Sequence, residues 1–162
     1  NHECCAELTS MQGIDYRHIP MTKDTKVAAF KEVEKCLEEQ QPELIVLARF
    51  MQIMPPHLCA KYAEQIINIH HGFLPSFSGA KPYHAAYDHG VKLIGATCHY
   101  VTQELDAGPI IEQDVIRVDH AASATDMVTR GRDVERNVLT RGVQCHLEDR
   151  VIVHNNKTVV FG

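Results

Sequence analysis

The chain has 162 residues, enough for one domain with a buried core and short for two. Hydrophobic residues make up 44% of the sequence and the formal net charge is -5, a globular composition that argues against a nucleic-acid or anionic-membrane partner. Neither an apolar run of membrane-spanning length nor a signal-peptide pattern occurs, so we expect no membrane partner.

The cysteines indicate a reducing compartment. None of them forms a C-x-x-C pair, and several lie in apolar stretches where a buried thiol is ordinary. They are Cys4, Cys5, Cys36, Cys59, Cys98 and Cys145. We therefore expect a cytoplasmic protein without structural disulfides. Because Asn1-His2-Glu3 is not an initiator methionine, we also expect a longer natural chain.

The first half of the chain alternates helix and strand patterns. An extended segment is expected over Tyr16–Ile19, followed by a helix from Thr25 whose apolar residues recur at helical spacing until Pro42 ends it. Compact apolar runs predict buried parallel strands at Leu44–Leu47 and Ile66–Ile69. Between them, Pro55-Pro56 begins a short helix that ends near Tyr62.

The second half continues this alternation. A helix is expected from Pro82 to His89, with Gly90 as its stop, and a long helix from Ser123 to about Leu147. The expected strands are Leu93–Val101 and Ile110–Val118, joined by the loop Thr102–Pro109, and Val151–Val153 and Thr158–Val160, joined at Asn155-Asn156. Such alternation is typical of βαβ units and predicts an α/β fold with a parallel sheet.

Polar residues gather at the strand ends, where open parallel sheets bind ligands. Asn68 and His70 share one face of their strand because side chains alternate, and the same rule groups Thr97 with His99. With Asp106 from the next loop, they could handle an acyl group. An amide can donate to a carbonyl oxygen, a charged imidazole can stabilise an oxyanion, and a carboxylate can activate water. Alternatively, the histidines only satisfy backbone groups.

Other chemistries have less support in the sequence. His70 and His71 are adjacent on a strand and point apart, and no H-E-x-x-H motif occurs, so we expect no metal site among the 11 histidines. Cys98 could be a nucleophile beside His99, but a small buried core residue is the simpler interpretation. The scattered glycines match neither a dinucleotide fingerprint nor a phosphate loop.

Two separated motifs carry a family resemblance. The stretch Asn68-Ile69-His70-His71-Gly72-Phe73-Leu74-Pro75 resembles the N-x-H…L-P motif of the folate-dependent formyltransferase superfamily. The second half of that signature appears as His99 and Leu105-Asp106-Ala107-Gly108-Pro109-Ile110. The resemblance extends from about Tyr16 onward. It implies a Rossmann-like, mostly parallel sheet of the formyltransferase fold that lacks its first strand, with residues 1–162 as the catalytic domain.

Within the superfamily, four stretches resemble the formyltetrahydrofolate deformylase branch: His70-His71, Gly79–His84, Gly95–Val101 and Gly131–Glu135. Transferase branches commonly have proline at the position of His71. Gly72 departs from the usual serine of deformylases, which removes a hydroxyl and loosens the turn. In the family a small regulatory domain and a first strand precede this region. Their absence would leave a strand edge and apolar surface exposed.

The resemblance also implies a site. Asn68, His70 and Asp106 match the catalytic set, and His99 would orient Asp106 or close the cleft. The pteridine pocket would be formed by Arg49, Phe50, Met51, Gln52, Ile53, Met54, Val101, Thr102, Glu104 and Leu105. Considered alone, Arg49 could be a solvated charge, and Met51 and Ile53 could be core residues. A cis peptide bond is expected at Leu74–Pro75.

The implied reaction is hydrolysis of 10-formyltetrahydrofolate to tetrahydrofolate and formate, in one-carbon and purine metabolism. The folate would be the substrate, no cofactor would be bound permanently, and the enzyme would be a homo-oligomer. Phosphoribosylglycinamide formyltransferase remains an alternative, whereas the acidic balance disfavours a methionyl-tRNA formyltransferase. A folate-binding fragment without activity is an alternative of another class.

Overall fold

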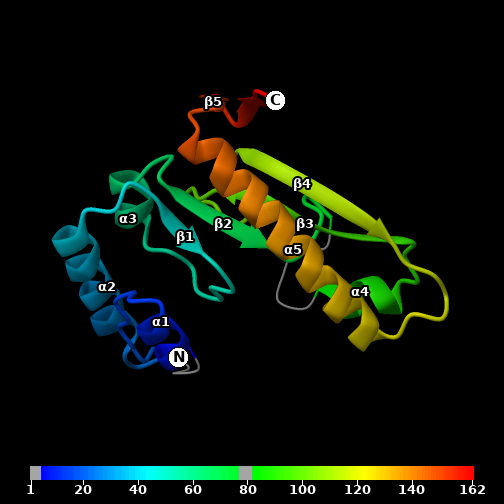
Figure 1. Cartoon of the computed structure of the whole chain (residues 1–162), viewed down its shortest axis with the longest axis horizontal. Helices are drawn as coiled ribbons and strands as arrows, with labels where there is room; N and C mark the ends of the chain where they lie inside the picture. Colours follow the sequence, from blue (N-terminus) through cyan, green and yellow to red (C-terminus); the bar gives the residue numbers. More distant parts are fainter. Residues whose placement is uncertain (1–4, 77–81) are drawn as a thin grey trace. The chain divides into compact units, whose positions relative to one another are not determined.

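The computed structural model describes residues 5–76 and 82–162 (Figure 1). Cys4 and the stretch Gly79–Lys81, which contributed to the sequence-based expectations, lie outside the described residues. The chain divides into two compact units, residues 1–43 and 44–162. Each unit is described by itself.

The first unit contains two helices, α1 (Ala6–Met11) and α2 (Lys26–Gln40). Helix α2 was predicted. It buries Ala29 and Phe30 and ends at Gln41, which adopts a left-handed conformation (φ 45°) immediately before proline. Helix α1 was not predicted, because six residues are too few for a helical apolar period to repeat. The segment Tyr16–Ile19 belongs to neither a helix nor a strand.

The second unit is built on a sheet with the strand order β1-β2-β3-β4. The strands are β1 (Ile45–Leu47), β2 (Ile66–His70), β3 (Leu93–Tyr100) and β4 (Ile110–Arg117). The predicted α/β fold is confirmed. The sheet is mixed, because β1 and β2 pair in parallel as predicted, whereas β2–β3 and β3–β4 pair antiparallel. Between β3 and β4 the chain returns through a short loop without a crossover helix, which requires antiparallel pairing.

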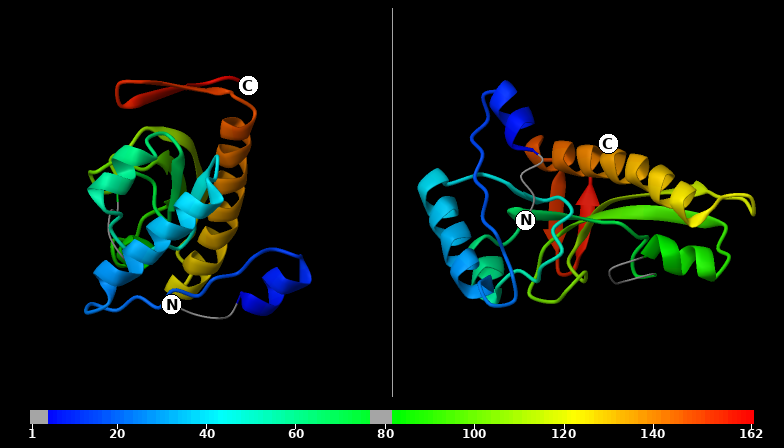
Figure 2. Two further views of the ribbon diagram at one scale, coloured as in Figure 1. Left: turned by 90° about the vertical axis from the view of Figure 1, so that its left-hand side faces the viewer. Right: turned by 90° about the horizontal axis from the view of Figure 1, so that it is seen from below.

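Three helices surround this sheet: α3 (Pro56–Lys61), α4 (Pro82–Asp88) and α5 (Ala124–Leu147). A capping box between Ser123 and Asp126 fixes the start of α5. Helix α5 lies along one face of the sheet, and the predicted hairpin of β5 (Val151–His154) and β6 (Lys157–Val160) follows its carboxyl end (Figure 2). Within the described part of the chain, no helix has both the length and the apolar character needed to cross a membrane.

The two faces of the sheet differ in composition. The face under α5 is apolar, and its core residues come from alternate positions of β2 and β3 and from α5: Ile67, Ile69, Ala96, Cys98, Tyr100, Val134 and Val138. Because side chains alternate along a strand, Asn68, His70, Thr97 and His99 occupy the other face. The sequence pattern therefore places these polar side chains together and away from α5.

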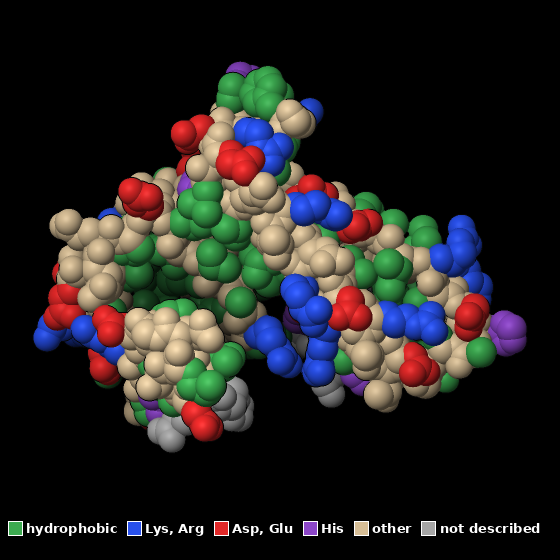
Figure 3. All heavy atoms as spheres, viewed as in Figure 1, with side chains coloured by type: hydrophobic (Ala, Val, Ile, Leu, Met, Phe, Trp, Pro, Cys, Tyr) green, Lys and Arg blue, Asp and Glu red, His purple; other side chains and the backbone are tan. Residues whose placement is uncertain are grey.

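Beside β1 runs an apolar groove of about 460 Å³, lined by Val46, Leu139, Val143 and Leu147 among others. Hydrophobic side chains are exposed beside α5 on the face drawn in Figure 3. Val46 is 40% exposed and Leu147 60% exposed.

Candidate active site

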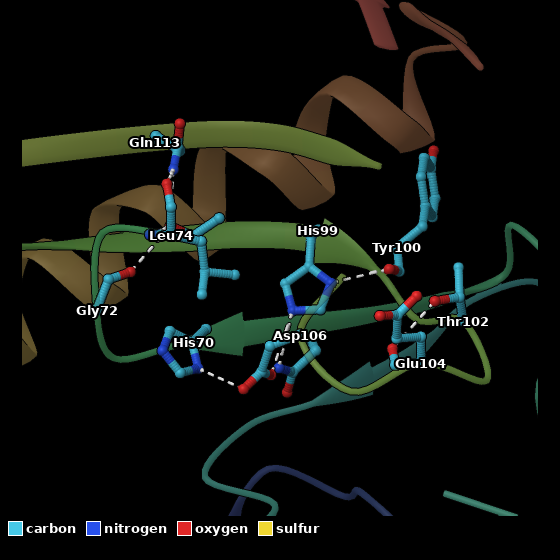
Figure 4. A network of polar contacts seen from close by, with 11 residues as sticks. His70, Gly72, Leu74, His99, Tyr100, Thr102, Glu104, Asp106 and Gln113 are labelled. Atoms are coloured by element: carbon cyan, nitrogen blue, oxygen red, sulfur yellow. Dashed lines mark hydrogen bonds and ion pairs between the residues drawn. The ribbon is translucent and has the colours of Figure 1, made fainter. Parts of the chain in front are cut away.

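The carboxylate of Asp106 lies between two histidines on the polar face of the sheet (Figure 4). Its Oδ2 is 3.3 Å from His70 Nδ1 and its Oδ1 is 3.9 Å from His99 Nε2. His70 is 5% exposed and the Asp106 side chain 14% exposed. A carboxylate in such a sheltered position interacts with an adjacent imidazole more strongly than it would in water.

His99 contacts Asn68 more closely than Asp106. Its Nδ1 is 2.8 Å from the carbonyl oxygen of Tyr100, which can only accept, so Nδ1 carries the proton. Burial lowers the pKa of His99, which favours the neutral ring. Nε2 is then an acceptor for the Asn68 amide, whose Nδ2 is 3.2 Å away. His99 was expected to orient Asp106 or close the cleft. The distances fit a different role better, in which His99 fixes the amide of Asn68.

The loop between β3 and β4 presents Asp106 in a left-handed conformation (φ 54°), which a short polar side chain tolerates. Gly108 allows this loop to lie against β3. A Cβ atom there would come within 1.8 Å of the Tyr100 carbonyl oxygen, so no larger residue fits. The Tyr100 amide also donates to the carbonyl of Pro109 at 2.9 Å. The Asp-x-Gly-Pro spacing is therefore the spacing that brings the carboxylate to the strand end.

The chain after β2 is held by hydrogen bonds to Thr97. The Thr97 hydroxyl donates to the Gly72 carbonyl (2.9 Å) and accepts from the Leu74 amide (3.0 Å) and from Gln113 Nε2 (2.9 Å). Gln113 also donates to the Leu74 carbonyl at 3.1 Å. Gln113 was not predicted, although it lies directly opposite Thr97 across β3 and β4. The predicted cis peptide bond at Leu74–Pro75 is confirmed.

Two adjoining cavities, of about 210 and 60 Å³, open over this polar face. All ten residues expected in the pteridine pocket line one or both of them. Arg49, Phe50, Met51, Gln52, Ile53 and Leu105 line the larger, and Met54, Val101, Thr102 and Glu104 line the smaller. Asn68 and Asp106 line both. The sequence missed Ile69 and His71 in the larger cavity and Leu47 and Gln103 in the smaller.

The larger of these cavities has mainly apolar walls, and some of its side chains are exposed. Met51 and Ile53 are 58% and 57% exposed, which excludes the alternative that they are core residues. Arg49, left-handed at φ 55°, lines the larger cavity. Apolar walls around a few convergent polar groups suit a planar heterocyclic ligand.

Other reactive groups do not gather here. Cys98 faces the core, and its burial raises the pKa of its thiol to about 12, which fits the interpretation as a core residue. Among residues 5–76 and 82–162, no group of three histidine, cysteine or carboxylate side chains is placed to hold a metal ion.

The sequence matches a known protein family over most of its length. The family model described as formyl transferase matches residues 6–143. Formyltetrahydrofolate deformylase from Bacillus subtilis is 52% identical over 99% of this chain and 54% of that protein. The protein of the same name from Escherichia coli is 44% identical over 99% of this chain and 58% of that protein. The chain thus spans about half the length of the curated relatives it matches.

Solved structures give the same relationship. A formyltetrahydrofolate deformylase from Pseudomonas syringae has a TM-score of 0.97 and 60% identity, covering 100% of this chain and 54% of that one. A phosphoribosylglycinamide formyltransferase from Anaplasma phagocytophilum has a TM-score of 0.87 and 31% identity, covering 97% of this chain and 76% of that one.

Proposed function

The chain belongs to the formyl transferase family, and on that premise we propose that it hydrolyses 10-formyltetrahydrofolate to tetrahydrofolate and formate. The observation that carries the proposal is the position of Asp106, within 3.3 Å of His70 at the edge of an apolar cavity. The matches to proteins named formyltetrahydrofolate deformylase, at 44–60% identity, favour water as the formyl acceptor. The transferase matches have lower identity.

Each polar group has a part in the proposed reaction. One amide hydrogen of Asn68 bonds to His99, which leaves the second free to donate to the formyl oxygen. Protonated His70 stabilises the negative charge that develops on that oxygen. Asp106 orients a water molecule whose oxygen attacks the formyl carbon, and it accepts the proton that the water releases.

The tetrahedral intermediate then collapses. The bond between the formyl carbon and the folate nitrogen breaks, the nitrogen takes up the proton delivered by Asp106, and formic acid leaves and ionises to formate in solution. His99 takes part only by fixing the amide of Asn68. The ten residues of the cavity walls bind the pteridine, with Arg49 supplying a positive charge at the rim.

We further propose that residues 1–162 form the catalytic domain of a cytoplasmic homo-oligomer that binds no nucleic acid. The net charge of -5 supports the last point. Because acid–base catalysis by side chains and water accounts for every step, the proposed reaction needs no permanently bound cofactor.

The test supplies purified protein with 10-formyltetrahydrofolate and no amine acceptor, and follows formate and tetrahydrofolate. Stoichiometric release of both supports the proposal. Release that begins only when glycinamide ribotide is added would identify a transferase instead. Folate binding without turnover under either condition would indicate an inactive folate-binding fragment.

A further inference from the structure

A column of side chains connects α5 to the back of His70. The His71 ring stacks on the His70 ring, with centroids 5.4 Å apart and an interplanar angle of 16°. The sequence-based expectation that these two side chains point apart was wrong, because β2 ends at His70 and His71 lies in the bend that follows it. The Tyr83 ring follows at 6.2 Å from His71, tilted by 44°. The Tyr83 hydroxyl donates to Oε1 of Glu135 on α5 at 2.8 Å. A helix that lines neither folate cavity thus reaches the proposed oxyanion-stabilising ring through two aromatic contacts.

Tyr83 is fixed more firmly than an ordinary core tyrosine. It is 6% exposed, and burial together with the neighbouring Glu135 raises the pKa of its hydroxyl, which stays protonated and remains a donor. A hydrogen bond to a charged carboxylate is stronger than one between neutral groups. The ring therefore has little freedom to move away from His71.

Gly131 on α5 makes room for this ring. A Cβ atom at position 131 would lie 2.2 Å from Tyr83 Cζ and 2.4 Å from its hydroxyl oxygen. The helix backbone at Gly131 thus lies close to the hydroxyl end of the Tyr83 ring. Gly131 and Glu135 are four residues apart, on the same face of α5, and both lie at the hydroxyl end of the Tyr83 ring.

The column is distinct from the walls of the folate cavities. Tyr83 lines a separate cavity of about 270 Å³, together with Phe73, Ala86 and Ile94. His71 is a wall of both this cavity and the larger folate cavity. A change at Tyr83 therefore reaches the larger folate cavity only through His71 and leaves its other walls in place.

We propose that Tyr83, anchored by Glu135, is a positioning residue that keeps His71 stacked on His70 and so keeps His70 directed at Asp106. The catalytic consequence rests on the proposed function, whereas the positioning itself does not. The stretches that meet here, His70-His71, Tyr83 and Gly131–Glu135, are far apart in the sequence. All three lie in stretches whose sequence resembles the deformylase branch. In the structure they contact one another as parts of the same column.

The kinetic test compares Tyr83→Phe with Tyr87→Phe, a matched control one turn later on α4 whose side chain is 47% exposed. Tyr83→Phe keeps the ring and removes its anchor. We expect kcat to fall between about 10- and 100-fold with KM for the folate unchanged, since a displacement of about 1 Å can cost 100-fold. Tyr87→Phe should keep the wild-type kcat. A folded Tyr83→Phe variant with the wild-type kcat would overturn the proposal.

Two variants of Glu135 test the same hydrogen bond without changing Tyr83, and they serve if the Tyr83→Phe protein does not fold. Glu135 is only partly buried, so its replacement perturbs the core little. Glu135→Leu should lower kcat by a factor similar to that for Tyr83→Phe. Glu135→Gln should lower it less, because the amide oxygen still accepts the tyrosine proton. Equal kcat values for the two Glu135 variants would contradict the role of the hydrogen bond.

The third readout needs no substrate. Ring carbon–proton NMR signals of His70 and His71 should shift in Tyr83→Phe and stay in place in Tyr87→Phe. Unchanged signals in Tyr83→Phe would refute the positioning role whatever the turnover. Shifted signals in a protein whose wild type releases no formate would uphold the column and reject the proposed function, so the two failures are distinguishable.

Discussion

The floor and the walls of the site are built in different ways. The floor consists of Asn68, His70 and His99 on two paired strands, and the two histidines are 5% and 2% exposed. The walls come from loops and carry exposed apolar side chains, with Met51 58% and Leu105 62% exposed. The pairing of β2 with β3 fixes the positions of the side chains that would carry out the chemistry. The exposed side chains of the loops are free to pack against a bound ligand.

This difference implies a division of function. A floor residue is held by hydrogen bonds and neighbouring strands, so its loss should reduce the rate of the chemical step. A wall residue contributes mainly apolar area, so its loss should weaken binding. Asp106 belongs to both regions, because it extends from a wall loop to the floor.

The largest effect is expected from removing the floor imidazole. His70→Ala should lower kcat about 100- to 1000-fold, the usual loss for one oxyanion-stabilising donor. Folate affinity should change little, since the walls remain. Steady-state kinetics and equilibrium binding measure the two quantities, with the exposed His120→Ala as control. A wild-type kcat in folded His70→Ala protein would remove the distinction between floor and walls.

Thr97, which shares a face of β3 with the floor residue His99, should contribute strongly to the stability of the fold. Thr97→Val keeps the shape of this fully buried side chain but leaves the Leu74 amide and the Gly72 carbonyl without their partner. We expect a loss of about 2–6 kcal/mol in the free energy of unfolding, from about 1–3 kcal/mol for each of the two unsatisfied groups. Denaturant titration measures it, with exposed Thr140→Val as control. Equal stability of the two variants would contradict the bracing role.

A substitution in a wall should affect folate binding and leave the rate of the chemical step unchanged. Leu105→Ala should raise KM for the folate roughly fivefold with little change in kcat, because it removes about 1 kcal/mol of apolar contact. Leu8→Ala is a matched control, since Leu8 is 61% exposed but lies in the other unit. A fall in kcat at constant KM would assign Leu105 to the chemistry instead.

The smallest effect concerns pH. Burial lowers the pKa of His99 below its ordinary value of 6.5, so the unfolded chain binds a proton more readily. Stability contributed by neutral His99 is therefore present above about pH 6.5 and lost as pH falls toward the folded-state pKa. Wild type should lose more unfolding free energy than His99→Gln between about pH 7.5 and about pH 5.5. Parallel pH profiles for the two proteins would argue against a buried neutral imidazole.

Much of the floor could be predicted from the sequence. Apolar runs located β1 and β2, and alternation along the strands grouped Asn68 with His70 and Thr97 with His99. The antiparallel pairing of β3 with β2 was harder to predict. Alternating strand and helix patterns locate the elements, but they do not determine in which direction a strand joins the sheet. Helix α1 was missed because its six residues are too few to show a repeating apolar period.

The contacts between side chains were less predictable than the face of the sheet on which each side chain lies. Gln113 supports the Leu74 backbone only because β4 aligns it with Thr97, and that register depends on tertiary pairing. The proton position on His99 depends on the Tyr100 carbonyl, which no spacing in the sequence indicates. Likewise, Tyr83 and Glu135 are 52 residues apart and meet only in the folded chain.

The most direct test of the proposed chemistry compares formate release by wild type and Asp106→Asn in the absence of any amine acceptor. The substitution keeps the size of the side chain and removes the group that would take the proton from water. We predict that wild type releases formate and tetrahydrofolate in equal amounts, and that Asp106→Asn binds the folate normally but releases almost no formate. Formate release at the wild-type rate by folded Asp106→Asn protein would contradict the assignment of water activation to this carboxylate.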